Sequence, residues 1–291
     1  MGGSPRPWLV FTAVLWAVTM IALPAASMTG RTPVNDDPLA KMIADANVSA
    51  IAAAQQRGAS AVDVALPFLH DGDRRVRLIA VDAIAAAGGP KAPQALIEAL
   101  SDTDEQVRID AVNGLHTHVP SGLERQVLAA WDQSKDPFVR RQLPIVLGRT
   151  GNPALIPQLN QRLRDATAEE TREGLVVGLA KLGDADARVR FGEMLAAARG
   201  EGVASMIEYV QYLNDPWVLP YLRPVLERKE TARVIGTHVK TVIRRGCDLA
   251  TDEVLRISGA KFSFAADPGA NYTDQQLFEV ERFLDQQKAT Q

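Results

Sequence analysis

Apolar residues recur along this chain in paired helical stretches at an almost fixed interval. Six landmark positions are separated by 31, 32, 32, 32 and 31 residues: Val76, Val107, Val139, Thr171, Val203 and Val234. After each landmark come a stretch with helical spacing of apolar residues, a short break and a second such stretch. Units of this kind bury their apolar faces only on their neighbours, so they stack into a solenoid. We expect an all-α fold, an α-solenoid of about seven stacked helix pairs.

The apolar spacing also places the individual helices and the ends of the array. The expected pairs are 39–56 with 61–69, 74–87 with 92–100, 105–116 with 123–131, 138–148 with 154–163, 169–182 with 187–197, 203–213 with 217–226, and 231–245 with 248–257. Residues 28–38 are polar and contain two prolines, which is typical of a linker. A capping box from Thr273 to Gln276 opens a final helix, which we expect to cover the last apolar face. The predicted division is therefore linker 28–38, solenoid 39–259 and C-terminal cap 260–291.

Three short segments share one motif at the same position of successive repeats. Each begins with Asp and ends with Val-Arg: 73–77, 104–108 and 136–140. Together with the Leu-Gly breaks at 147–154 and 182–187, they resemble the short bacterial HEAT-like repeats first named for phycobilisome lyases. The resemblance covers roughly 39–259 and implies the fold, while it says little about activity. The pattern weakens along the chain, since the landmark becomes Thr171 and the following Arg is replaced by Ala204 and Ile235.

The first 27 residues have the features of an export signal. Arg6 is their single charge, residues 8–26 are uncharged, and Ala25, Ala26 and Ser27 are small. This order is typical of a secretory signal peptide, although residues 8–26 could also remain as a membrane anchor. We therefore expect a periplasmic or secreted protein, or one held at the inner membrane by residues 8–26. Cys247 is the chain's one cysteine, which excludes an intrachain disulfide and predicts a packed thiol.

Charge and motifs narrow the classes of function. The chain has 32 basic and 35 acidic residues and a net charge of −3, which gives no footprint for nucleic acid. His116 and His118 form the one candidate metal pair, but residues two apart on a helix point to different faces. No phosphate loop, nucleophile elbow or zinc-type cysteine cluster is present. We expect no catalytic residues, no metal and no cofactor, and hence a protein that is not an enzyme.

Two sets of side chains are candidates for binding a partner. Second helices are expected to line the concave wall, and from the third unit onward arginines predominate on them; the candidates are Arg125, Arg162, Arg190 and Arg223. Such a row would suit an acidic peptide or protein segment, although a solvated face is the simpler alternative. Aromatic residues typical of interface hot spots gather at Tyr209, Tyr212, Trp217 and Tyr221, where core packing is the alternative.

The repeated charged residues have structural explanations. Asp73, Asp104 and Asp136 stand where helix N-caps are expected. Arg77, Arg108 and Arg140 are expected to pair with Asp residues of neighbouring units, and a ligand-binding row is the alternative.

These features favour an exported scaffold or adaptor that binds a protein or peptide through its concave surface. The first alternative is an accessory subunit of an envelope enzyme or secretion machine. The second is a lyase-like enzyme that modifies a partner protein.

Overall fold

A computed structural model describes residues 30–236 and 241–289 of the chain, and the predicted signal or anchor lies outside them. The first helices of the successive units are α2 (Ser49–Arg57), α4 (Arg74–Ala87), α6 (Glu105–Thr117), α8 (Pro137–Gly148), α10 (Glu169–Leu182) and α12 (Glu201–Leu213). The second helices are α3 (Ser60–Ala65) with η1 (Leu66–His70), α5 (Ala92–Ala99), α7 (Glu124–Gln133), α9 (Ile156–Asp165) after η2 (Pro153–Leu155), α11 (Ala185–Ala197), and α13 (Leu219–Leu222) between η3 (Pro216–Val218) and η4 (Arg223–Glu227). This order confirms the expected all-α solenoid.

The landmark residues show why the units stack. Val76, Val107, Val139, Thr171 and Val203 are all buried, each near the start of a first helix. Asp73, Asp104 and Asp136 cap α4, α6 and α8 by accepting a backbone N–H two residues further on, at 2.9, 3.0 and 2.9 Å. The units that start at α4, α6 and α8 therefore begin with a capped helix whose first turn is anchored in the core.

The beginning of the array differs from the prediction. A single helix over 39–56 is wrong, because α1 (Pro38–Ala44) and α2 are separated by a turn in which Ala46 has φ 50°. The Asn47 side chain accepts the Ser49 N–H at 2.9 Å, and so favours a new helix start over continuation. Residues 30–32 lie against the first unit, where Thr32 N–H donates to Asp71 at 2.7 Å.

The last unit lacks its first helix. The predicted helix over 231–245 is wrong, since these residues form an antiparallel hairpin of β1 (Thr231–Gly236) and β2 (Thr241–Arg245), in which Val234 pairs with Ile243. The segment is rich in β-branched residues, which favour strands, and Val234 is 62% exposed where the other landmarks are buried. The hairpin contacts α12 and α14 (Gly246–Ser258), so it occupies the place of the missing helix.

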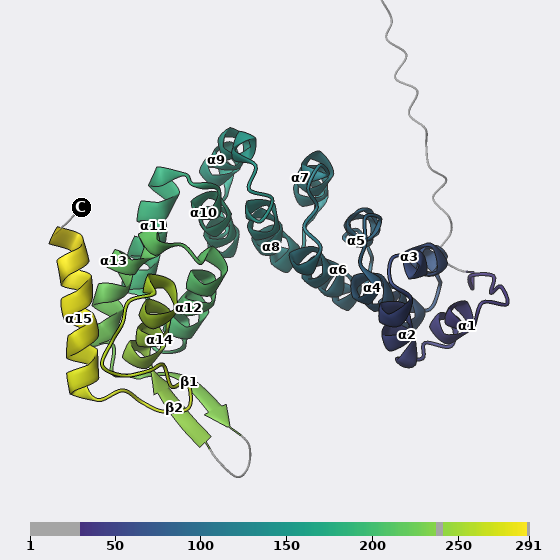
Figure 1. Cartoon of the computed structure of the whole chain (residues 1–291). Coiled ribbons are helices and arrows are strands. Elements are labelled where there is room, and N and C mark those ends of the chain that lie inside the picture. Colours follow the sequence, from purple (N-terminus) through teal and green to yellow (C-terminus); the bar gives the residue numbers. More distant parts are fainter. Residues whose placement is uncertain (1–29, 237–240, 290–291) are drawn as a thin grey trace, which may run out of the picture.

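The solenoid bends into an arch with the first helices on its inner side (Figure 1). In that view α5, α7, α9 and α11 follow the outer edge, and α4, α6, α8 and α10 lie below them. The first helices from α2 to α10 pack closely on one another, whereas the second helices from α5 to α11 scarcely touch one another. The expectation that second helices line the concave wall is therefore wrong. On α10, Gly174 and Gly178 allow the backbones of α8 and α10 to approach closely on the inner side.

The C-terminal end closes the core. Helix α15 (Asp274–Ala289) packs on α13, η4 and α14 and buries Leu277, Val280 and Leu284. The crossing that leads to α15 is fastened by buried Arg244, which donates to the carbonyl oxygens of Asp267 (2.8 Å) and Ala270 and pairs with Asp252. Within the described residues, no helix is long and apolar enough to cross a bilayer.

Candidate functional site

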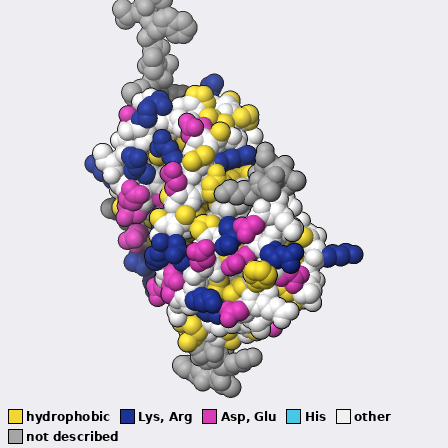
Figure 2. All heavy atoms as spheres, turned by 90° about the vertical axis from the view of Figure 1, so that its left-hand side faces the viewer, with side chains coloured by type: hydrophobic (Ala, Val, Ile, Leu, Met, Phe, Trp, Pro, Cys, Tyr) yellow, Lys and Arg dark blue, Asp and Glu magenta, His cyan; other side chains and the backbone are white. Residues whose placement is uncertain are grey.

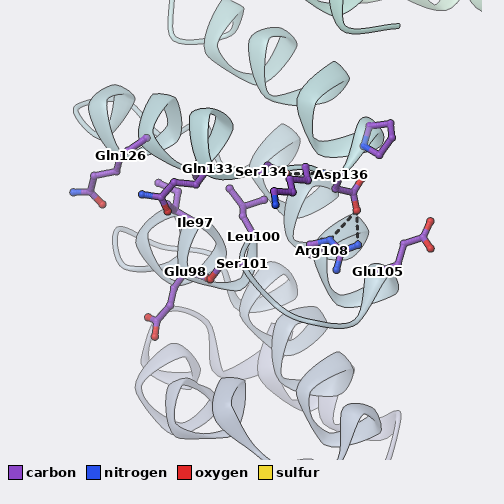
Figure 3. Close-up of a pocket in the computed structure, with 14 residues that line it drawn as sticks. Ile97, Glu98, Leu100, Ser101, Glu105, Arg108, Gln126, Gln133, Ser134 and Asp136 are labelled. Carbon is purple, nitrogen blue, oxygen red and sulfur yellow. Dashed lines mark hydrogen bonds and ion pairs between the residues drawn. The ribbon is translucent and has the colours of Figure 1, made fainter. Parts of the chain in front are cut away.

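A large cleft lies between α5 and α7, on the outer row of the arch (Figure 3). Its volume is about 910 Å³. It forms because α4 and α6 pack together beneath it while α5 and α7 scarcely touch. The α6–α7 connection, residues 118–123, is also longer than the α4–α5 connection, residues 88–91. The opening is thus a product of the bend and of one long loop.

Apolar side chains make the floor of this cleft. Ile97 on α5 and Leu100 just after it face α7 (Figure 3). Ala129 and Ala130 of α7 also line the cleft, and their small side chains leave room between the two helices. Ile97 and Leu100 are nevertheless buried, so the floor belongs to the packed core. The cleft can accept an apolar side chain without rearrangement of that core.

The rim of the cleft is polar, and some of its side chains have no hydrogen-bond partner among the described residues. Gln126 and Gln133 on α7 are exposed, and neither side-chain carboxamide makes a hydrogen bond to another described residue. Glu98 lies 2.6 Å from His70 Nε2. Glu105 and Lys135 complete the rim with opposite charges. The two carboxamides are two helical turns apart on one face, and each offers both a donor and an acceptor to a ligand.

One end of the cleft is closed by a repeated arginine contact. Arg108 donates to Asp136 at 2.7 Å and to the carbonyl oxygen of Asp102 at 2.8 Å. The same contact, to the carbonyl six residues earlier, recurs at Arg77, Arg140 and Arg172. The predicted pairing between units is confirmed for Arg77, which binds Asp102 at 2.7 and 3.0 Å, and for Arg108. For Arg140 it is wrong, since its guanidinium lies 4.1 Å from the Trp131 ring centroid.

The arginines predicted as a row do not form one basic groove. Arg162 binds Asp132 at 2.6 and 3.0 Å, and Arg223 pairs with Glu227, Glu281 and Asp285. Arg125 and Arg190 are exposed and make no ion pair with a described residue. On the face shown in Figure 2, Lys and Arg alternate with Asp and Glu. Neighbouring carboxylates, which sequence spacing did not reveal, neutralise Arg162 and Arg223 but not the other two arginines.

The aromatic residues divide between two places. Tyr209 and Tyr212 on α12 point into the core: the Tyr209 hydroxyl donates to Glu173 at 2.6 Å, and that of Tyr212 donates to the Ile145 carbonyl at 2.7 Å. Burial raises the pKa of Tyr209 to about 12. Trp217 and Tyr221 are partly exposed and stack edge-to-face, with centroids 6.0 Å apart. The four residues therefore do not present one contact surface.

The long reach of Tyr209 and Tyr212 depends on glycine. Gly174 and Gly178 on α10 lie against the backbone of α8, and a Cβ on Gly178 would stand 2.2 Å from the Pro144 carbonyl oxygen. Without side chains at these positions, residues of α12 can reach α8, two units earlier. The spacing Gly174-x-x-x-Gly178 was the sequence signal for this contact.

The two histidines contact other residues of the chain, and the thiol is buried. His116 Nε2 lies 3.0 Å from Gln142 Oε1, and burial lowers its pKa. His118 Nε2 lies 2.6 Å from the Ala85 carbonyl oxygen. Cys247 is buried, which raises its pKa to about 11. Within the described residues, no group of three His, Cys, Asp or Glu side chains could hold a metal ion.

The stacked pairs and the matches to known proteins define the class of this protein. Residues 38–116 and 93–180 match the family model of HEAT repeats. The chain is a HEAT-like repeat protein, as its sequence predicted. It is similar to the bilin biosynthesis protein PecE of Nostoc sp. (strain PCC 7120 / SAG 25.82 / UTEX 2576), with 29% identity over 150 residues. That match covers 48% of this chain and 59% of the relative.

This similarity corrects one expectation. The sequence motifs predicted a protein that is not an enzyme, and similarity to a biosynthetic protein contradicts that prediction. Function depends on particular sites and not on the fold, so the lack of a local catalytic motif does not decide the activity class.

Proposed function

We propose that this HEAT-like repeat scaffold binds a segment of a partner protein in the cleft between α5 and α7. The observation that carries the proposal is the pair of unpartnered carboxamides, Gln126 and Gln133, above an apolar floor. Seven helical residues span about 10 Å, which is close to three residues of extended chain. The carboxamides can therefore hydrogen-bond to a peptide backbone while one of its side chains rests on the floor made by Ile97 and Leu100.

The charge of the partner and its location extend this proposal. Arg125 lies beside Gln126 on α7 without an ion pair to a described residue, and it suits an acidic residue in the bound segment. The features of residues 1–27 support binding outside the cytoplasm, in the periplasm or beyond it.

Peptides selected from a displayed random library provide the test. Their affinities for the wild-type chain are measured by fluorescence polarisation and compared with those for Ala129→Trp, which fills the cleft, and for Gln126→Ala/Gln133→Ala. We expect each variant to bind at least about tenfold more weakly, and Arg125→Glu to discriminate against peptides with an acidic residue.

The matched control is Gln56→Ala on α2, an exposed carboxamide far along the chain, which should leave the affinity unchanged. Selected peptides that bind all variants equally would rule out this cleft as the site.

The similarity to PecE favours a second candidate, a lyase-like role in which the scaffold handles a bilin together with its protein partner. Titration of the chain with a bilin, followed by visible absorbance, should then give a saturable spectral change. If the spectrum of the bilin is unaltered by the protein, with or without a selected peptide, this second candidate is wrong and the scaffold role is unaffected.

A further inference from the structure

A second cleft, which shares no residue with the first, lies where α8, α10, the end of α11 and α12 meet. Its volume is about 500 Å³. One wall carries Arg141 and Glu173, and the other is formed by Met194, Met206 and small residues. Met206 belongs to the core, whereas the side chains of Arg141 and Glu173 are 33% and 26% exposed. The cleft thus joins a methionine-lined pocket to a charged pair that remains in contact with water.

The polar wall is held rigidly from behind by Tyr209. Arg141 donates from Nε (3.0 Å) and Nη2 (2.6 Å) to the tyrosine hydroxyl, which itself donates to Glu173 Oε1 at 2.6 Å. Arg141 Nη2 also lies 2.9 Å from Glu173 Oε1. All three side chains are therefore fixed by one another, which favours binding because little rotamer freedom remains to be lost.

Two polar atoms of this cluster have no hydrogen-bond partner among the described residues. They are Arg141 Nη1, a donor, and Glu173 Oε2, an acceptor. Glu170 also acts electrostatically on Arg141, so the negative charges of two carboxylates act on one guanidinium. The site consequently repels an anion, although it contains an arginine. A ligand that suits it offers an acceptor and a donor side by side without a negative charge.

We propose that this cleft binds an uncharged amide group joined to an apolar substituent. The amide carbonyl accepts from Arg141 Nη1 and the amide N–H donates to Glu173 Oε2, while the apolar part contacts Met194 and Met206. Methionine side chains suit this role because they adapt to apolar groups of different shape. The amide can belong to a small molecule or to a peptide.

The test compares an amide with its acid. N-acetylphenylalaninamide, N-acetylphenylalanine and the single-amide probe phenylacetamide are titrated into the full chain, and binding is followed by ligand-observed NMR. We expect saturable binding of the amides and at least about tenfold weaker binding of the acid. Stronger binding of N-acetylphenylalaninamide than of phenylacetamide would support a peptide ligand, and equal binding a small amide.

Two variants locate the binding site. Glu173→Gln keeps an acceptor for Tyr209 and replaces the free acceptor with a donor, and Ala197→Phe fills the cleft from an exposed position. Both should abolish amide binding, and Glu169→Gln on the same helix should not. Unchanged melting temperatures exclude unfolding as the cause. Equal binding of amide and acid, binding that survives both variants, or no saturable binding by wild type would overturn the proposal.

Discussion

Arg74 and Arg77 lie three residues apart on α4, and each meets an aspartate of the next unit, yet their surroundings differ. Arg77 is 5% exposed and binds Asp102 through two atoms, while the Arg74 side chain is 63% exposed and reaches Asp104 at 3.2 Å. Water screens the second pair and not the first. Burial, rather than the pairing itself, therefore decides how much each arginine contributes to stability.

Arg77→Met should lower the free energy of unfolding by about 3–5 kcal/mol, because it leaves the Asp102 carboxylate buried without its partner. Arg74→Met should cost less than about 1 kcal/mol. Urea denaturation of both variants measures the difference. Equal losses would show that the buried pair has no special weight.

A single residue, Asp82, makes the free energy of unfolding depend on pH. Burial, with a smaller effect from Asp110, raises the pKa of Asp82 to about 6. The pKa of Asp82 is higher in the folded state than in the unfolded state, so folding favours its protonated form. The stability that this form confers is complete below about pH 4 and is lost as the pH rises through 6. Asp82→Asn should therefore become more stable relative to wild type between pH 4 and 6, by on the order of 1–2 kcal/mol, and the gain should then level off.

Thermal denaturation across that pH range measures the effect. Asp110→Asn should reproduce only part of it, since the neighbouring charge is the smaller of the two causes. A difference between wild type and Asp82→Asn that does not change with pH would contradict the assignment.

At the scale of elements, the contact between α8 and α10 is the closest in the molecule's inner row. A Cβ on Gly174 would stand 1.9 Å from the Arg141 carbonyl oxygen, and one on Gly178 would be similarly crowded. The helices thus meet backbone to backbone. This approach is also what lets Tyr209 reach Arg141 and build the second cleft.

Gly174→Ala should destabilise the protein by about 3 kcal/mol or more, because the obstructing atoms belong to rigid backbone. Gly202→Ala on α12 meets no atom within 4 Å and should stabilise by about 0.5–1 kcal/mol through helix propensity. Guanidinium denaturation compares the two substitutions. Equal effects would mean that α8 and α10 can separate without loss.

Sequence predicts these elements well where one unit resembles the next. The capping aspartates and buried landmarks followed from spacing, since capping and burial are local or involve adjacent units. The hairpin was missed because Val234 keeps the period while its β-branched surroundings favour a strand. The second cleft was missed because Tyr209 contacts a residue 68 positions away. Yet Arg141 and Glu173 both stand two places after their landmarks, so their contact could have been predicted.

Over the whole molecule, stability is built from contacts between neighbouring units, so damage should remain local. The interface of α15 with α13 and α14 is the last of these contacts. Residues far from it, such as those of α4, have no direct dependence on it.

Val280→Asp places a charge at a fully buried position of α15 and should loosen α13 to α15 and the hairpin. Hydrogen exchange should then accelerate in this region and remain slow in α4 to α8. Phe278→Asp, at a 59% exposed position of the same helix, should change neither. Acceleration throughout the chain would show that the array unfolds as a single cooperative unit.

The two rows of the arch have different mechanical properties. In its inner row α2, α4, α6, α8 and α10 pack closely on one another, whereas the outer helices α5, α7 and α9 make few contacts with each other. The inner row therefore resists stretching, and the solenoid bends mainly by changes in the spacing of the outer helices. A peptide bound between α5 and α7 would set the distance between these two helices of the outer row, and so the local curvature of the solenoid. Small-angle scattering should show peptide binding as a change in the radius of gyration, because a change of curvature at one point moves the two ends of the solenoid relative to each other.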